Sequence, residues 1–106
     1  MPTYKVLAQS APSAATATTL LTASSATIVS TLNAANIGST QDTIRIAVRP
    51  AGASLANQHY IAYGVPLAAG AVFSIQGGIT LANTDVITVY STTGNTVFSA
   101  FGSDGN

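Results

Sequence analysis

The stretch TIRIAVR at residues 43–49, followed by Pro50, decides the fold class of this chain. Side chains in an extended strand point alternately to its two faces. One face of this stretch carries the apolar set and the other carries the two arginines: Ile44, Ile46 and Val48 against Arg45, Ala47 and Arg49. Pro50 has no backbone N–H to donate to a neighbouring strand, so we expect the strand to end there. The pattern is typical of a half-buried β-strand.

Seven further segments have strand character and are separated by turn signals. The chain has 8 Val, 8 Ile and 15 Thr, and these β-branched residues favour strands over helices. We expect the seven strands at about 4–9, 17–22, 27–34, 58–64, 71–76, 85–92 and 96–102. The spacing predicts an all-β protein: an antiparallel β-sandwich, either jelly-roll or immunoglobulin-like, of about eight short strands. The order in which the strands pair does not follow from the sequence.

Composition excludes several classes of function. The 106 residues make one domain, expected over 1–102 with a flexible C-terminal tail at 103–106. Three Lys and Arg balance three Asp, and a neutral chain cannot neutralise many phosphates, so binding to nucleic acid by charge is not expected. With no Cys and one His, we expect no disulfide, no zinc site and no cofactor.

The sequence also lacks the features of a membrane or secreted protein. No run of about 18 apolar residues is present, so no membrane-spanning helix is expected. The apolar segment Val6–Leu7–Ala8 is too short for the core of a signal peptide. We therefore expect synthesis in the cytoplasm and a final location that is reached by assembly.

The titratable residues do not form a catalytic pattern. As a general base, His59 would need a nucleophile and an orienting acid. Ser54 and Asp42 are of the right types, but nothing in the sequence places them beside His59. Asp42 and Asp85 each stand just before a strand, where we expect the carboxylate to accept backbone N–H groups in an Asx-turn. Gly77–Gly78 fits a tight turn with positive φ and not a phosphate loop. We expect no catalytic residue, no metal ligand and no enzymatic activity.

Several strands are apolar on both faces, which suggests a second layer of cover. In 85–90, Ile87 and Val89 oppose Val86 and Tyr90; in 97–101, Val97 and Phe101 oppose Phe98 and Ala100; Tyr60, Ile61 and Tyr63 likewise divide between faces. A chain this small covers only one face, so we expect the other to meet another subunit, with homo-oligomers included. The zero net charge agrees with this expectation. The alternative is that Ser and Thr hydroxyls keep the outer faces solvated.

Aromatic and arginine side chains are the candidates for those contacts, because these residue types dominate interface energetics. The set comprises Tyr4, Arg45, Arg49, Tyr60, Tyr63, Tyr90 and Phe98. Arg45 and Arg49 share one strand face and suit bidentate contacts to a partner's carboxylates, although a solvated outer face explains them equally well. The four tyrosines also permit a weaker interpretation, a platform on which sugars stack.

Several segments resemble small virion proteins of tailed bacteriophages, notably those that infect cyanobacteria and marine bacteria. The likeness covers nearly the whole chain, and its most distinctive part is the opening MPTYKVLAQSAP at 1–12. The other segments are IRIAVRPAG at 44–52, HYIAY at 59–63 with VPL at 65–67, GITL at 78–81 and DVITVY at 85–90. The chain has Ala23, Ala34 and Ala62 where the family pattern has bulkier residues.

The resemblance implies a structural component of the particle, without catalytic residues. The leading expectation is a capsid cement or decoration protein that binds the major capsid protein or other virion proteins and stabilises the shell. A tail, baseplate or fibre component is the first alternative, and copy number per particle distinguishes the two. A module that binds a carbohydrate or a receptor is the second alternative, and an enzyme stands last.

Overall fold

The computed structural model describes residues 4–76 and 78–103, and 59% of it is β-strand. The described part contains nine strands and two single-turn 3₁₀ helices, η1 (Pro50–Gly52) and η2 (Asn57–His59). The strands are β1 (Lys5–Ser10), β2 (Thr18–Thr22), β3 (Thr27–Asn36), β4 (Asp42–Arg49), β5 (Tyr60–Leu67), β6 (Val72–Ile75), β7 (Ile79–Leu81), β8 (Val86–Ser91) and β9 (Thr96–Ser103). The all-β prediction is confirmed.

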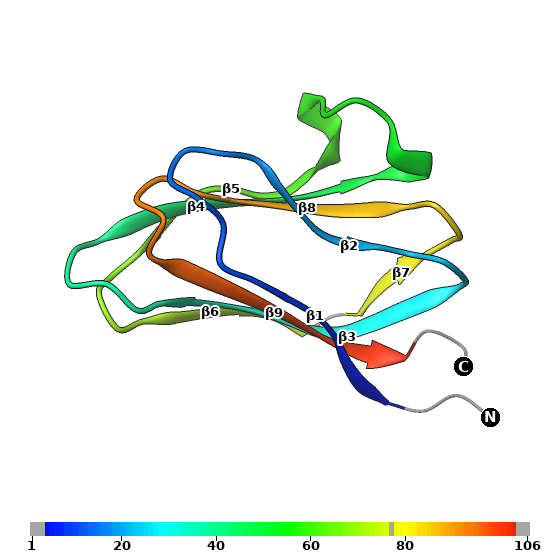
Figure 1. Cartoon of the computed structure of the whole chain (residues 1–106), viewed down its shortest axis with the longest axis horizontal. Coiled ribbons are helices and arrows are strands. Elements are labelled where there is room, and N and C mark those ends of the chain that lie inside the picture. The colour runs from blue at the N-terminus through cyan, green and yellow to red at the C-terminus, as the bar shows by residue number, and fades with distance from the viewer. Residues whose placement is uncertain (1–3, 77, 104–106) are drawn as a thin grey trace.

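The strands form two antiparallel sheets that face each other (Figure 1). Sheet A has the order β1-β9-β3-β6, with β7 also paired to β3. Sheet B has the order β2-β8-β4-β5. Most connections cross from one sheet to the other, and the two orders together are those of a jelly roll. This is one of the two sandwich types that the sequence predicts.

The structure has nine strands because the edge strand that pairs with β3 is interrupted and forms two short strands. β6 pairs with Leu32–Ala35 of β3 and β7 pairs with Thr27–Val29, so the two short strands lie one after the other along the same edge. Gly78, between them, has φ +81°, as predicted for this turn. Gly77 lies outside the described residues.

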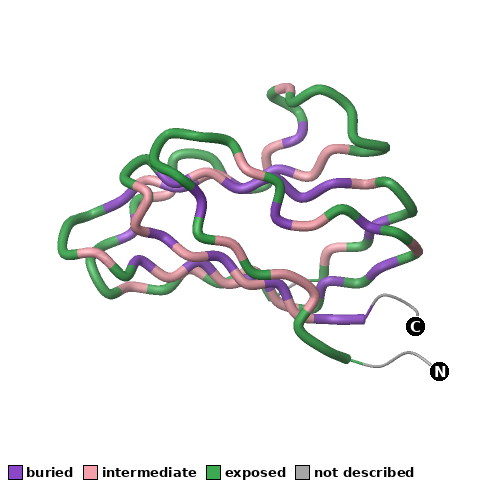
Figure 2. The backbone as a smooth tube through the Cα atoms, viewed as in Figure 1, coloured by how far each residue is buried: buried purple, intermediate pink, exposed green. Residues whose placement is uncertain are grey.

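The core lies between the sheets and is built from the inward-facing side chains, which are every second residue along each strand. Figure 2 shows this alternation as buried and exposed segments along the tube. The predicted faces of β4 and β9 are confirmed, with Ile44, Ile46, Phe98 and Ala100 fully buried. Ala23, Ala34 and Ala62 are also buried in this core.

Several predicted strand boundaries move by one to three residues; β3 ends at Asn36 in place of 34, and β5 ends at Leu67 in place of 64. The segment at 58–59 belongs to η2, so β5 begins at Tyr60 and not at 58. β9 continues through Ser103, which pairs with Ile28 and is buried, so the predicted tail boundary at 103 is wrong for that residue. The remainder of the predicted tail, 104–106, lies outside the described residues.

Residues 50–59 form an excursion that projects from sheet B on the side away from sheet A (Figure 1). β4 ends at Arg49, as the position of Pro50 predicts. The excursion is tied back to sheet B at Asp85, whose carboxylate accepts the N–H of Ala51 at 2.8 Å. The outer face of sheet B is therefore partly covered by the chain's own residues.

Candidate interaction surface

Two β-bulges in β5 bring tyrosines to the outer face of sheet B. Opposite β4, Ile44 pairs with Val65 and Arg45 with Tyr63, so Gly64 is the extra residue of the first bulge. Gly64 has φ +67°, a conformation that glycine adopts without strain. Without this bulge, Tyr63 would oppose Ile46 and face the core.

The second bulge acts on Tyr60 in the same way. Ile46 pairs with Ala62 and Ala47 with Tyr60, so Ile61 is the extra residue. Tyr60 and Tyr63 consequently share one face, where their rings meet edge to face with centroids 4.8 Å apart. Strict alternation placed these two tyrosines on opposite faces, and the bulge is the physical reason that this expectation is wrong.

Arg45 lies between two tyrosine rings, in an arrangement that we call the Arg45 stack: Tyr63, Arg45 and Tyr90. Arg45 on β4 pairs with Tyr63 on β5 and with Tyr90 on β8, so the three residues form one row across the sheet. The guanidinium carbon lies 4.5 Å from each ring centroid. Cation–π attraction of about 0.5–2 kcal/mol per ring holds the group in place.

The guanidinium of Arg45 has no hydrogen bond or ion pair with any other described residue. Its Nε is buried and without an acceptor. The terminal nitrogens are not among the buried unpartnered atoms and make no hydrogen bond within the described chain, so their N–H groups face solvent. The side chain is thus a cation held between two rings, with its terminal N–H donors open to solvent and its Nε buried.

Arg49, on the same face of β4, is occupied internally. Its Nε donates to the Thr88 hydroxyl at 3.0 Å, and one terminal nitrogen donates to the Ala53 carbonyl at 3.0 Å. These bonds attach the excursion to β8. The two arginines that alternation places on one face therefore differ: two N–H donors of Arg49 are used within the chain, whereas those of Arg45 make no hydrogen bond with another described residue.

An open cavity of about 510 Å³ lies beside the stack, lined by Asn57, Tyr60 and Tyr63. Asn57 belongs to η2, so the excursion supplies an amide group next to the two rings. Sequence reasoning did not find Asn57, because only the fold brings the excursion next to β5.

Two predicted contact residues remain, Tyr4, which is exposed, and Phe98, which is buried. Tyr4 is 80% exposed beside the start of β1, far from the stack in the strand order. Phe98 is fully buried, so its prediction as a contact residue is wrong. The residue lies on the inward face of the central strand β9, where it is the largest fully buried side chain.

Sheet A has an outer face of a different kind. The register places Val6, Val97, Phe101, Ala35 and Val72 on this face, alternating with polar residues such as Gln9, Ser99, Asn33 and Ser74. Val6 and Val72 are more than half exposed. None of the described strand residues on this face is charged. The pattern agrees with the expectation that strands here are apolar on both faces.

Asp42 is a buried carboxylate with a structural role. It accepts hydrogen bonds from the N–H groups of Thr43 and Thr93 and from the hydroxyls of Ser91 and Thr96. Burial alone raises the pKa of this carboxyl, but the four hydrogen bonds outweigh it and lower the pKa to about 2. The group ties β4 to the connection that crosses from β8 in sheet B to β9 in sheet A.

Asp85 also acts on the backbone. Its carboxylate accepts the N–H groups of Ala51 and Ala82, which lower its pKa. The prediction that both aspartates accept backbone N–H groups is confirmed, but neither closes an Asx-turn, because Asp42 bonds the adjacent Thr43 and Asp85 reaches back to Ala82. His59, just before β5, accepts the Ala56 N–H at Nδ1, 3.1 Å away. The hydrogen bonds of Asp42 and His59 do not connect, and Ser54 is exposed on the excursion.

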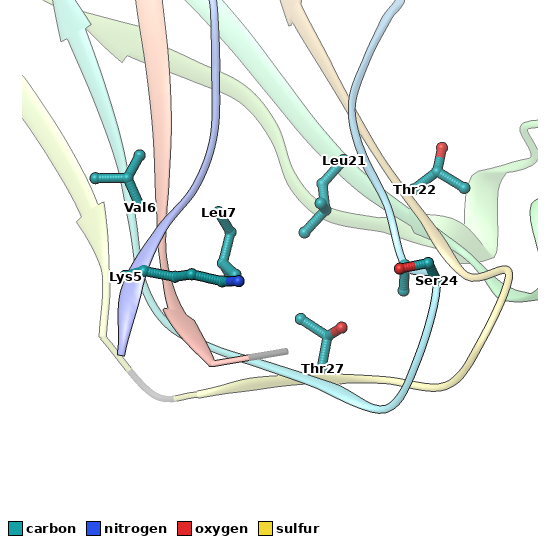
Figure 3. A pocket seen from close by; sticks show the side chains of 8 residues that line it. Lys5, Val6, Leu7, Leu21, Thr22, Ser24 and Thr27 are labelled. Atoms are coloured by element: carbon teal, nitrogen blue, oxygen red, sulfur yellow. The ribbon is translucent and has the colours of Figure 1, made fainter. Parts of the chain in front are cut away.

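A second cavity, of about 200 Å³, opens between the edge strands of the two sheets. It is lined by β1 and by the segment from β2 to β3 (Figure 3). Lys5 extends its amino group toward Leu7 and Leu21, whereas Val6 points away. Apart from the Lys5 amino group, the side chains that line this cavity are apolar or carry hydroxyls.

Within residues 4–76 and 78–103, no group of three or more His, Cys, Asp or Glu could hold a metal ion. The same residues include no helix with the length and apolarity needed to cross a membrane. No protein-family profile, curated protein or solved structure matches this chain.

Proposed function

We propose that the protein is a structural subunit of a bacteriophage particle, most specifically a capsid cement protein that binds the major capsid protein. The observation that carries the mechanism is the exposure of large apolar side chains on both outer faces of one small sandwich. Val6, Ile28 and Val72 are exposed on sheet A, and Ile61 and Tyr63 on sheet B. The phage setting rests on the sequence resemblance described above.

Such a subunit works by burying these faces against its neighbours. A specific protein interface buries about 800 Å² on each partner. Sheet A offers its outer face for that purpose, and sheet B offers the part of its outer face that the excursion at 50–59 leaves uncovered. Because the same contact repeats over a symmetric shell, many contacts that are weak singly add to a large stabilisation.

The copy number of the protein in purified particles tests the proposal. A cement protein occupies equivalent sites over the whole shell, so quantitative mass spectrometry should find on the order of hundreds of copies per particle. A count between one and a few tens of copies per particle would instead assign the protein to the tail, baseplate or fibre. Complete absence from the particles would contradict both assignments.

A second function is favoured by the cavity that Asn57, Tyr60 and Tyr63 line. Aromatic rings beside an amide can stack on a sugar and hydrogen-bond its hydroxyls. If the protein binds glycans there, a glycan array should give saturable binding that Tyr60→Ala abolishes and Tyr4→Ala retains. Absence of binding across the array would remove this function.

A further inference from the structure

The Arg45 stack presents a cation for which the described part of the chain supplies no anion. Asp42 already accepts four hydrogen bonds in the interior, and Asp85 accepts two backbone N–H groups. Asp104 lies outside the described residues. Neither described carboxylate is available to a second copy without the loss of those bonds, so among the described residues of a second copy no carboxylate is free to reach Arg45.

The geometry of the stack suits a carboxylate in particular. The tyrosine rings approach the guanidinium from the strands on either side of β4 and restrict its rotation. The terminal N–H groups remain as donors in the guanidinium plane, and a carboxylate accepts two parallel N–H bonds from such a fork. Restricting the guanidinium before binding reduces the entropy lost when the contact forms.

Two neighbouring features add donors and space. The hydroxyls of Tyr63 and Tyr90 make no hydrogen bond with other described residues. The cavity of about 510 Å³ beside the stack can hold the peptide around an acidic side chain, and Asn57 can hydrogen-bond a peptide group there.

We propose that the Arg45 stack is the receptor for an Asp or Glu side chain on an exposed segment of another protein. This inference rests on the proposed function, for which it names the chemistry of the partner. It also separates the two arginines: Arg45 makes the contact between molecules, and Arg49 holds the excursion in place.

The probe is a short synthetic peptide that contains glutamates, compared with the same peptide carrying glutamines. Titration of the ¹⁵N-labelled full chain should shift the Arg45 Nε–H resonance and the ring protons of Tyr63 and Tyr90 with the glutamate peptide only. Equal shifts with both peptides would overturn the proposal. This comparison uses the wild-type protein, so it does not depend on the folding of a variant.

Matched variants assign the effect to one side chain. Arg45→Gln and Arg49→Gln remove the same charge from the same strand face, and the dispersion of the amide spectrum reports whether each is folded. Arg45→Gln should weaken binding of the glutamate peptide by about tenfold or more. Arg45→Lys should weaken binding less, because lysine keeps the charge but lacks the planar fork. Equal weakening by Arg49→Gln would reduce the contact to general charge attraction and overturn the proposal.

Particles separate this inference from the proposed function. If phage particles that carry Arg45→Gln contain the normal number of copies of the protein, the proposed contact between Arg45 and a carboxylate is wrong, but the proposed structural role is retained. If wild-type particles lack the protein but the glutamate peptide binds through Arg45, the structural role is wrong and the contact stands. Self-association that Arg45→Gln abolishes would show that a second copy occupies the stack, and would overturn the choice of partner.

Discussion

At the scale of single residues, Asp42 illustrates how a nearly uncharged chain uses a charge inside its fold. The carboxylate lies where β4 begins and accepts the Thr43 N–H from that strand. The N–H of Thr93 and the hydroxyls of Ser91 and Thr96 reach it from the end of β8 to the start of β9. Four donors compensate for the loss of hydration that burial imposes. The ionised form is therefore the one that the folded state stabilises.

The pH dependence of stability follows from this. Asp42 has a pKa of about 2 when folded and an ordinary value of 3.8. Above the ordinary value the stabilisation is complete, and it is lost as the pH falls toward the folded pKa, because the unfolded chain takes up the proton first. Urea titrations should show the free energy of unfolding decreasing by about 2 kcal/mol over this range.

Asp42→Asn provides the control for that measurement. The amide keeps the shape but places two N–H donors among existing donors, so we expect it to be less stable by about 3 kcal/mol at neutral pH. Its stability should change less between pH 4 and pH 2, with a remainder from Asp85, whose pKa is also lowered. A variant with the full wild-type pH dependence would show that Asp42 is not the group responsible.

At the scale of elements, the bulge at Gly64 determines which side chains reach the surface. An alanine Cβ there meets nothing within 4 Å, so Gly64→Ala tests backbone conformation and not packing. Because φ is +67°, we expect a loss of about 1 kcal/mol in urea unfolding and a changed near-UV circular dichroism as Tyr63 leaves Arg45. Gly70→Ala, with the same strain at φ +79° and equal space, should lose stability but keep the tyrosine spectrum.

Gly102 is required for a different reason, the close approach of β9 to β3. A Cβ at this position would lie 1.9 Å from the carbonyl oxygen of Ile28, which is backbone and cannot move aside. Gly102→Ala should therefore cost more than about 4 kcal/mol, and thermal unfolding should show a poorly folded or unfolded chain. A melting temperature close to that of Gly70→Ala would contradict the pairing of β3 with β9.

The strands could be predicted from the sequence, whereas the bulges could not. Alternation in 43–49 gave the correct faces for Arg45 and Ile46, because β4 is regular along its own length. The position of Tyr60 depends on how β5 is registered against β4, which is a contact between separate segments. Gly64 was visible as a glycine within a strand, a signal that often marks a bulge.

At the scale of the whole molecule, the pairing order lay beyond the sequence. β1 pairs with β9 and β2 pairs with β8, so strands from the two ends of the sequence are neighbours in both sheets. Local propensity carries no information on partners so distant. The same limit explains the contact residues: composition identified tyrosine and arginine, but only the assembled sheets distinguish the exposed Tyr63 from the buried Phe98.

The uncharged outer face of sheet A predicts self-association. Light scattering of the purified chain should give a mass that is a multiple of 10.6 kDa. Val72→Asp places a charge on this face at a position that is 61% exposed, and should yield a monomer. Ile37→Asp adds the same charge at an exposed loop position and should leave the mass unchanged. A wild-type monomer in dilute solution would contradict the prediction.

The chemical contrast between the two outer faces gives them opposite responses to dissolved ions. Contacts made through Arg45 weaken as ionic strength rises, because mobile ions screen the attraction between opposite charges. Contacts through the outer face of sheet A, where none of the described strand residues is charged, tighten in sulfate, which salts out apolar surface. A choice of buffer could therefore detach the protein from one neighbour while it remains attached to the other.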